Sequence, residues 1–393
     1  MVLKGLNVVD LSRVLAGPFC AQLLADGGAS VIKVESREGD ENRRWTPIMP
    51  DGISSNFASV NRGKRFMTLN LKSPAAPEIL RRLVRHADVM LHSFLPDTAA
   101  RLGLTYDALH ALNPRMIFCS LSGYGECGPL RNKPGYDLMV QAFCGAMSVT
   151  GYEDGPPVRT GISFIDMATG LSAYGAIMTA LYARETSGTG TSVRTSLLET
   201  AVALLGYHAV AWLQASIVPR KQGSGGANQA PYQAFRCRDG YLLVGAPNNP
   251  AWLRLCAALG DDTLAADPRF ATNASRVEHK AALIPLLEAH FSRQSVAYWT
   301  DVLEAAGIAV SPIQTLDQVM THPQVHANEL VIASVAEDGG AVPLVGMPFK
   351  LGGERPDTLR SARALGADTD DILRSDLAFT DCEIDRLRAT ETI

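Results

Sequence analysis

Hydrophobic and polar residues form two alternating kinds of segment along the first half of the chain. Short runs rich in apolar or β-branched residues have the length and composition of β-strands, at residues 5–11, 30–35, 66–71, 88–92, 114–121 and 191–196. Segments with apolar residues at helical spacing lie between them, for example at 17–26 and 74–86. Strands that alternate with helices predict a parallel sheet with helices on both faces. We therefore expect a doubly wound α/β domain over residues 1–215.

The pattern changes after a Gly-rich polar stretch at residues 216–230, which is interpreted as a linker or as a mobile lid. Two β-rich runs joined by Asp239 and Gly240 predict a hairpin. Helices are expected after it, at residues 251–259, 276–291 and 296–306. These elements predict a smaller α+β domain over residues 231–315. The remaining tail, residues 316–393, is expected to form a hairpin and a helix-like end, and to return to the large domain.

Composition narrows the possible functions. The chain has 393 residues, of which 47% are hydrophobic and 19% charged, and its net charge is −4. This charge gives no electrostatic reason to expect nucleic acid or an acidic membrane surface as a partner. No apolar run is expected to be long enough to span a membrane, and no signal-peptide pattern is present at the start. The seven scattered cysteines contain no CxxC pair, so reduced thiols, a cytoplasmic location and no metal site are expected.

Asp166 is the most informative single residue. Residues 158–165 alternate between apolar and polar and predict a strand, whereas 167–186 are rich in Ala and Gly and predict a helix. Asp166 therefore lies where a strand is expected to end and a helix to begin, and open α/β sheets bind ligands at that edge. A carboxylate there can cap the helix or act as a nucleophile tuned by the same amides. Position alone leaves both interpretations open.

Cations gather in the loops near the predicted strand 66–71. Each one alone is typical of solvated surface, but a cluster near strand ends indicates an anionic ligand such as a phosphate-bearing cofactor. The cluster consists of Arg43, Arg44, Arg62, Lys64 and Arg65, with Lys72 close behind. The first loop, residues 12–18, has no GxGxxG pattern, and Pro18 removes one amide that could face a phosphate. A nicotinamide dinucleotide is therefore not favoured.

A set of short motifs occurs in order along nearly the whole chain. They are VDLSRVLAGP at 9–18, VIKVE at 31–35 with GD at 39–40, NRGKR at 61–65, NPR at 113–115, SGYG at 122–125, GYD at 135–137, ID at 165–166, and DPRF at 267–270 with Arg276. This ordered set resembles the family III CoA transferases, which include formyl-CoA transferase, carnitine CoA transferase and α-methylacyl-CoA racemase. The resemblance implies a Rossmann-like large domain and a homodimer of two chains threaded through each other as linked rings.

The resemblance also implies roles for individual residues. Asp166 matches the nucleophile of the family. The implied coenzyme A site contains Val14, Arg43, Leu69, Lys72, Ser93, Phe94, Arg101 and Leu102. The implied supporting residues are Leu15, Tyr136 and Asp137 near the catalytic carboxylate, with Gly225 and Gly226 in a loop that covers it.

Two departures from the family pattern affect the expected reaction. In the racemases a His that transfers a proton stands just before the Asp of the Gly-x-Asp motif. Here this position is Tyr136, whose reference pKa of about 10 makes it a poor base. This argues for acyl transfer. Formyl-CoA transferase has Gln and Glu where this chain has Leu15 and Asp137, so the oxalate–formate pair is not favoured.

The expected function is transfer of coenzyme A from an acyl-CoA, with succinyl-CoA as the expected donor, to a small dicarboxylic acid. Aspartyl anhydrides and an aspartyl-CoA thioester would be the intermediates, and no permanently bound cofactor is expected. Arg13 and Arg159 are candidate partners of the acceptor carboxylate, although ordinary ion pairs explain them equally well. The alternatives are a 2-methylacyl-CoA racemase or epimerase, and a CoA-ester-binding protein without turnover.

Overall fold

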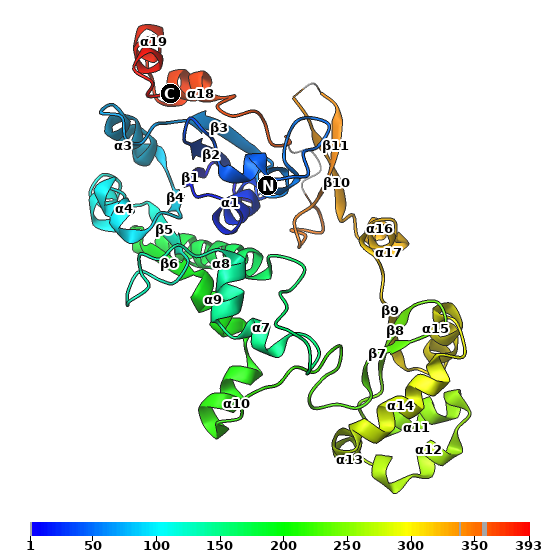
Figure 1. The fold of residues 1–393 in the computed structure, drawn as a ribbon. Helices are drawn as coiled ribbons and strands as arrows, with labels where there is room; N and C mark the ends of the chain where they lie inside the picture. The colour runs from blue at the N-terminus through cyan, green and yellow to red at the C-terminus, as the bar shows by residue number, and fades with distance from the viewer. Residues whose placement is uncertain (1, 338, 356–359) are drawn as a thin grey trace. The chain divides into compact units, whose positions relative to one another are not determined.

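The computed structural model describes residues 2–337, 339–355 and 360–393, which form two compact units (Figure 1). The first unit contains the described parts of Met1–Ala146, Thr160–Ser216 and Pro323–Ile393. The second unit contains Met147–Arg159 and Ile217–His322. Both units are therefore built from segments that are distant in sequence.

A six-stranded sheet forms the centre of the first unit, and all of its neighbouring strands are parallel. Its spatial order is β3-β2-β1-β4-β5-β6 (Figure 1). The strands are β1 (Asn7–Leu11), β2 (Ser30–Glu35), β3 (Lys64–Thr68), β4 (Val89–His92), β5 (Ile117–Ser122) and β6 (Ser192–Ser196). The predicted parallel sheet is confirmed. The order reverses between β1 and β4, and doubly wound sheets bind ligands at such a point.

Buried side chains form a separate apolar cluster on each face of this sheet. Successive strand residues point to opposite faces, so Val8 joins one cluster and Val9 the other. The first cluster contains α1 (Ala16–Asp26) and α8 (Phe164–Ser187). The second contains α3 (Ala76–His86) and α19 (Asp381–Ala389). The shorter elements of the first unit are η1 (Glu41–Arg44), α2 (Ser55–Ala58), α4 (Pro96–Arg101), α5 (Tyr106–His110) and α6 (Asp137–Phe143). Helix α7 (Ala146–Val149) begins at the last residue of the segment Met1–Ala146 and continues into the second unit.

The structure corrects two expectations around the first unit's helices. Residues 158–163 form no strand; Ile162 is 72% exposed, so its apolar side chain has no sheet to pack on. Asp166 therefore lies in the first turn of α8 rather than after a strand. The single helix expected over 197–215 is two helices, α9 (Leu197–Leu204) and α10 (Tyr207–Ala215). They are separated at Gly206, whose φ of 50° interrupts the helix.

Helix α8 is long and apolar enough to cross a membrane by length and composition alone, so the expectation that no run reaches that length is wrong. A core helix passes the same test. Here α8 packs against α1, and Gly170 allows this close approach because a Cβ there would lie 2.7 Å from the carbonyl oxygen of Ala16. This helix–helix contact explains Gly170, whereas Gly175 is exposed and a Cβ there would meet no atom within 4 Å.

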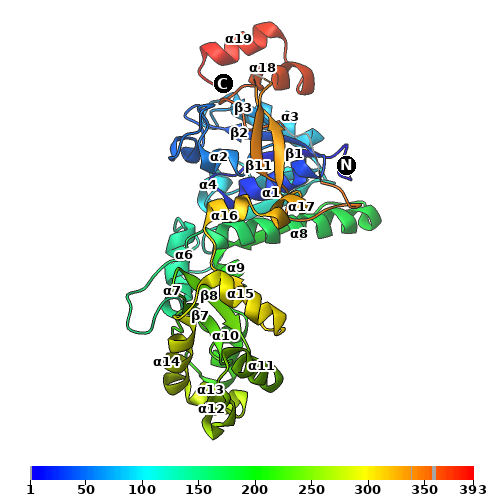
Figure 2. The ribbon, with the colours of Figure 1, turned by 90° about the vertical axis from the view of Figure 1, so that its right-hand side faces the viewer.

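The tail contains α17 (Pro323–Ala327), the predicted hairpin β10 (Val331–Val335) and β11 (Ala341–Val345), then α18 (Thr369–Asp371), the π-helical turn η3 (Ile372–Asp376) and α19 (Figure 2). Its side chains also accept hydrogen bonds from backbone amides at the outer edge of β3. The Phe66 amide donates to Asp368 Oδ2 at 2.9 Å, and the Thr68 amide donates to Thr369 Oγ1 at 3.1 Å. Exposed strand edges favour pairing with other chains, and the tail blocks this one.

The second unit contains a three-stranded antiparallel sheet in the order β7-β8-β9. Its strands are β7 (Tyr232–Arg236), β8 (Tyr241–Gly245) and β9 (Ala309–Pro312), and the predicted hairpin around Gly240 is confirmed. The helical elements are α11 (Asn249–Leu259), α12 (Asp262–Ala266), η2 (Pro268–Phe270), α13 (Asn273–Glu278), α14 (Lys280–Phe291), α15 (Val296–Ala305) and α16 (Leu316–Met320). The fully buried Arg276 donates to the carbonyl oxygens of Ala230, Pro247 and Phe270, which joins three loops.

Candidate active site

Two cavities open at the carboxyl edge of the six-stranded sheet. The larger has a volume of about 840 Å³ and lies at the ends of β1, β2 and β3; we call it the large cavity. The smaller, of about 260 Å³, lies at the ends of β1, β4, β5 and β6; we call it the small cavity. Arg13, Phe94 and Thr98 line both, so the cavities adjoin where the strand order reverses.

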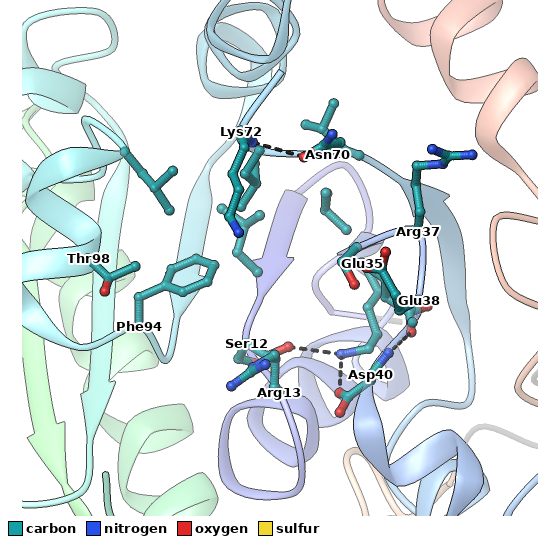
Figure 3. Close-up of a pocket in the computed structure, with 18 of the residues that line it drawn as sticks. Ser12, Arg13, Glu35, Arg37, Glu38, Asp40, Asn70, Lys72, Phe94 and Thr98 are labelled. Atoms are coloured by element: carbon teal, nitrogen blue, oxygen red, sulfur yellow. Dashed lines mark hydrogen bonds and ion pairs between the residues drawn. The ribbon is translucent and has the colours of Figure 1, made fainter. Parts of the chain in front are cut away.

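Most of the residues expected to bind coenzyme A line these cavities. The large cavity is lined by Leu69, Lys72, Phe94, Arg101 and Leu102 (Figure 3). Lys72 is exposed, and no described residue forms an ion pair with it, so its ammonium group is available to an anion. Among the residues that the structure describes, Thr98 is the one to which Arg101 donates a hydrogen bond, from Nη2 to Oγ1 at 3.1 Å.

Sequence reasoning missed several residues of the large cavity. Arg37 and Glu38 follow β2 directly, and Asn70 follows β3, so all of them sit in turns after strands (Figure 3). Arg37 forms an exposed ion pair of 3.1 Å with Glu391, which also lines this cavity. Their position directly after parallel strands was the available signal, because such turns meet at one edge of a sheet.

Asp166 lies in the small cavity together with Val14, Ser93 and Tyr136. Its side chain is 8% exposed, and no described residue donates a hydrogen bond to its carboxylate. Burial raises its pKa to about 7, and the nearby negative charge of Asp137 adds to this increase. A buried, unpaired carboxylate with a raised pKa in a cavity has the properties of a catalytic group rather than of a structural one.

Asp137 holds the start of α8 in place. One of its oxygens, Oδ2, accepts from the amides of Ile165 at 2.9 Å and Asp166 at 3.0 Å, and Oδ1 accepts from the Gln141 side chain. Gln141 in turn accepts from the Thr160 amide at 3.1 Å. The helix is therefore capped by a carboxylate from α6, and the interpretation of Asp166 as the cap is wrong. Asp137 is fully engaged in this structural task, which leaves Asp166 available for chemistry.

Tyr136 lies at the rim of the small cavity, where its hydroxyl donates to Glu41 Oε1 at 3.1 Å. Partial burial raises the pKa of this phenol above its usual range, and the Glu41 carboxylate raises it further. The phenol therefore stays protonated at neutral pH. This agrees with the expectation that residue 136 is not a base.

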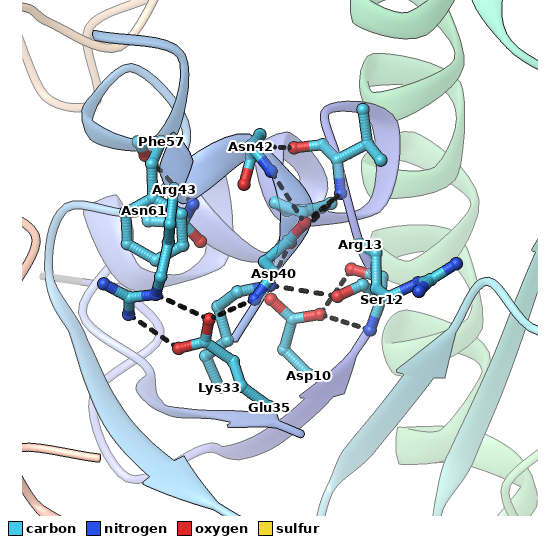
Figure 4. A network of polar contacts seen from close by, with 12 residues as sticks. Asp10, Ser12, Arg13, Lys33, Glu35, Asp40, Asn42, Arg43, Phe57 and Asn61 are labelled. Atoms are coloured by element: carbon cyan, nitrogen blue, oxygen red, sulfur yellow. Dashed lines mark hydrogen bonds and ion pairs between the residues drawn. The ribbon is translucent and has the colours of Figure 1, made fainter. Parts of the chain in front are cut away.

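The cation cluster is a set of internal ion pairs rather than an anion site. Arg43 binds Glu35 with two hydrogen bonds of 2.7 Å, donates to the Arg363 carbonyl oxygen, and lies 3.7 Å from the centre of the Phe57 ring (Figure 4). Its guanidinium is engaged on all sides, and it lines neither cavity. The other pairs are Arg62 with Asp26, Lys64 with Asp10, and Arg65 with Asp371 and Asp376, while Arg44 donates to a backbone oxygen.

Four further expected site residues are not among those that line these cavities. Leu15 packs into an apolar cluster with Phe19 and contributes no side chain to either cavity. Arg159, Gly225 and Gly226 belong to the second unit, where the Gly226 amide donates to the carbonyl oxygen of Tyr232 at 3.0 Å. Their roles near Asp166 stay predictions. Within the described residues, no group of three His, Cys, Asp or Glu side chains could hold a metal ion.

Comparison with known proteins identifies the family of this chain. Residues 3–369 match the description of CoA-transferase family III. An acyl-CoA transferase of Fusarium pseudograminearum is 42% identical, over 94% of this chain and 84% of its own length. The succinyl-CoA:glutarate CoA-transferase of Mus musculus is 36% identical, over 100% of this chain and 90% of its own length. A CAIB/BAIF family protein from Brucella suis has a similar structure, with a TM-score of 0.86 and 36% identity over 95% of this chain and 99% of its own. The chain therefore belongs to CoA-transferase family III and is an acyl-CoA:carboxylate CoA-transferase.

Proposed function

We propose that this enzyme transfers coenzyme A from succinyl-CoA to a small dicarboxylic acid such as glutarate, with Asp166 as the covalent nucleophile. The observation that carries the proposal is the unpaired carboxylate of Asp166 in the small cavity, beside the large cavity that we assign to the rest of coenzyme A. The mouse relative named for succinyl-CoA and glutarate supports this choice of donor and acceptor.

The reaction is proposed to proceed through four acyl transfers. An Asp166 oxygen attacks the thioester carbonyl of the donor, so the C–S bond breaks and a mixed anhydride and CoA thiolate form. The thiolate attacks the aspartyl carbonyl, which releases the donor acid and leaves an aspartyl-CoA thioester. The acceptor carboxylate attacks this thioester and displaces the thiolate again. The thiolate finally attacks the acceptor acyl carbon, which forms the new acyl-CoA and regenerates the Asp166 carboxylate.

Arg13 is proposed to orient the free carboxylate of the dicarboxylic acid. It lines both cavities at their junction, and no described residue forms an ion pair with it. Arginine binds carboxylates with two parallel hydrogen bonds, which fixes their orientation as well as their charge. Lys72 and Arg101, in the large cavity, are proposed to bind phosphate groups of coenzyme A.

The proposal predicts a trapped adduct and a defined set of products. With succinyl-CoA alone, hydroxylamine should convert Asp166 to its hydroxamate, because the aspartyl thioester is the reactive acyl group on the protein. Peptide mass spectrometry locates the modification, and protein treated with hydroxylamine without succinyl-CoA is the control. A panel of C3–C6 dicarboxylic and monocarboxylic acids then shows which new CoA esters form. Modification at another residue, or esters of monocarboxylic acids alone, would contradict the proposal.

We further propose that the enzyme is a homodimer of chains threaded through each other. Helix α10 has no buried residue, and its apolar side chains Tyr207, Trp212 and Leu213 are exposed, Leu213 by 79%. Apolar surfaces of this kind mark protein interfaces, and a second copy of the chain is the proposed partner. Sedimentation equilibrium should give twice the 42.1 kDa chain mass. The double variant Trp212→Ala, Leu213→Asp should lower this mass, and a monomeric parent protein would contradict the proposal.

A further inference from the structure

The turn between β1 and α1 contains a strained residue that the proposed chemistry does not explain. Val14 has a φ of 68°, in the left-handed region. A β-branched residue is unfavourable there because its Cβ approaches the following carbonyl oxygen too closely. Such a conformation persists only where the surrounding structure holds it in place.

Both backbone polar groups of Val14 are held by side chains from one short segment. The Val14 amide donates to Asp40 Oδ2 at 3.1 Å and to Oδ1 at 3.3 Å. The Val14 carbonyl oxygen accepts from Asn42 Nδ2 at 2.7 Å. Asp40 is itself fixed by a buried ion pair of 3.2 Å with Lys33 (Figure 4). These contacts form a clamp on Val14.

The neighbouring residues of the turn are held in the same way. The Ser12 amide donates to Asp10 Oδ1 at 2.9 Å, and the Ser12 carbonyl oxygen accepts from Lys33 Nζ at 2.9 Å. The Arg13 amide donates to Ser93 Oγ at 3.0 Å. Side chains from several elements therefore fix the backbone of this turn, and the turn lines the small cavity.

Packing alone does not explain Asn42. The residue is fully buried, yet no described residue donates a hydrogen bond to its Oδ1 atom. A buried acceptor without a partner is unfavourable, so an apolar residue would suit the same space better. The hydrogen bond from its Nδ2 to Val14 is the contribution that an apolar residue could not make.

We propose that Asp40 and Asn42 are positioning residues for CoA transfer, because their clamp keeps Val14 in the left-handed conformation and fixes the turn that lines the small cavity together with Asp166. Small displacements at a reacting centre lower the rate without abolishing substrate binding. The inference depends on the proposed function, since it takes the small cavity to be the site of reaction.

The test is a double-mutant cycle between residues 14 and 42. Asn42→Ala should lower kcat by about 10-fold or more, whereas KM for the acyl-CoA should change by less than about 3-fold. In the Val14→Gly background the same substitution should lower kcat by less than about 3-fold, since glycine adopts a positive φ without strain. If Asn42→Ala does not fold, Asn42→Ser takes its place in the cycle.

Asn113→Ala is the matched control. Asn113 also donates from its side-chain amide to backbone carbonyl oxygens, those of Val84 and Ala87, but it lines neither cavity. Its replacement should lower the melting temperature and leave kcat unchanged. The inference would be overturned if Asn42→Ala lowered the melting temperature and left kcat unchanged. It would also be overturned if Asn42→Ala lowered kcat by the same factor in the parent and in the Val14→Gly background. The hydroxamate experiment on the parent enzyme separates this failure from a wrong nucleophile, because it reports on Asp166 alone.

Discussion

Asp166→Asn is expected to lower kcat by at least about 10⁴-fold, since an amide cannot form the anhydride on which the reaction depends. Asn has nearly the same shape as Asp, so folding and acyl-CoA binding should persist. Steady-state kinetics and isothermal titration with coenzyme A measure the two effects separately. A loss of less than about 10-fold would mean that another residue is the nucleophile.

The same substitution should stabilise the protein at high pH. The folded-state pKa of Asp166, about 7, lies above its usual value of 3.8, so the folded state binds the proton more tightly than the unfolded state does at pH values between the two. Protonation of Asp166 therefore makes its full contribution to the free energy of unfolding below about pH 4, and this contribution is lost as the pH rises through about 7. Asn carries no charge, so the melting temperature of Asp166→Asn should exceed that of the parent at pH 8 and approach it at pH 4–5. In the parent enzyme, kcat/KM should rise with pH through an apparent pKa of about 7.

Lys64→Met is expected to destabilise the first unit by about 3–5 kcal/mol, because it leaves one member of a buried ion pair without its partner. The Lys64 side chain is fully buried and donates to Asp10 at 2.9 Å, to the Pro18 carbonyl oxygen at 2.9 Å and to Asn61 at 2.8 Å. The melting temperature should fall by roughly 10 °C. Asp10→Asn added to Lys64→Met should recover part of this loss, since it removes the buried carboxylate that has lost Lys64 as a partner.

Lys72→Met provides the matched control for this experiment. The chemical change is the same, but Lys72 is exposed at the large cavity. Its melting temperature should stay within about 2 °C of the parent. Its KM for the acyl-CoA should rise by about 10-fold, as expected for the loss of a charge-assisted hydrogen bond. If Lys64→Met and Lys72→Met lowered the melting temperature equally, the buried ion pair of Lys64 and Asp10 would not be what stabilises the first unit.

The parallel sheet could be predicted from the sequence, whereas the partners of the clustered cations could not, and both outcomes have physical reasons. The inner strands of the large sheet carry apolar runs, such as Val89-Met-Leu91 in β4, because they are buried on both faces, and such runs can be read directly. Residues 158–163 show the limit of this approach. Their apolar and polar residues alternate, but they pair with no neighbouring strand and therefore form none. Asp166 was identified through its motif and its position before a helix. That no described residue donates a hydrogen bond to its carboxylate could not be predicted. The helix amides are taken instead by Asp137, which comes from a different element.

Charge partners are also set by tertiary structure rather than by spacing. Arg43 and Arg62 pair with Glu35 and Asp26, which lie 8 and 36 positions away along the chain, so no local pattern separates them from Lys72. The strain at Val14 was equally invisible, because nothing in the sequence around a valine indicates a positive φ. Only the distant Asp40 and Asn42 explain how the chain maintains that conformation.

The protection of β3 by the C-terminal tail has a consequence for biosynthesis. Asp368 and Thr369 lie some 300 positions after the strand that they cover, at separations of 302 and 301. About 300 further residues must therefore be synthesised before Asp368 and Thr369 can cover the outer edge of β3. We expect the edge to be open to pairing with other chains during that interval, because uncovered strand edges favour aggregation while a protein folds.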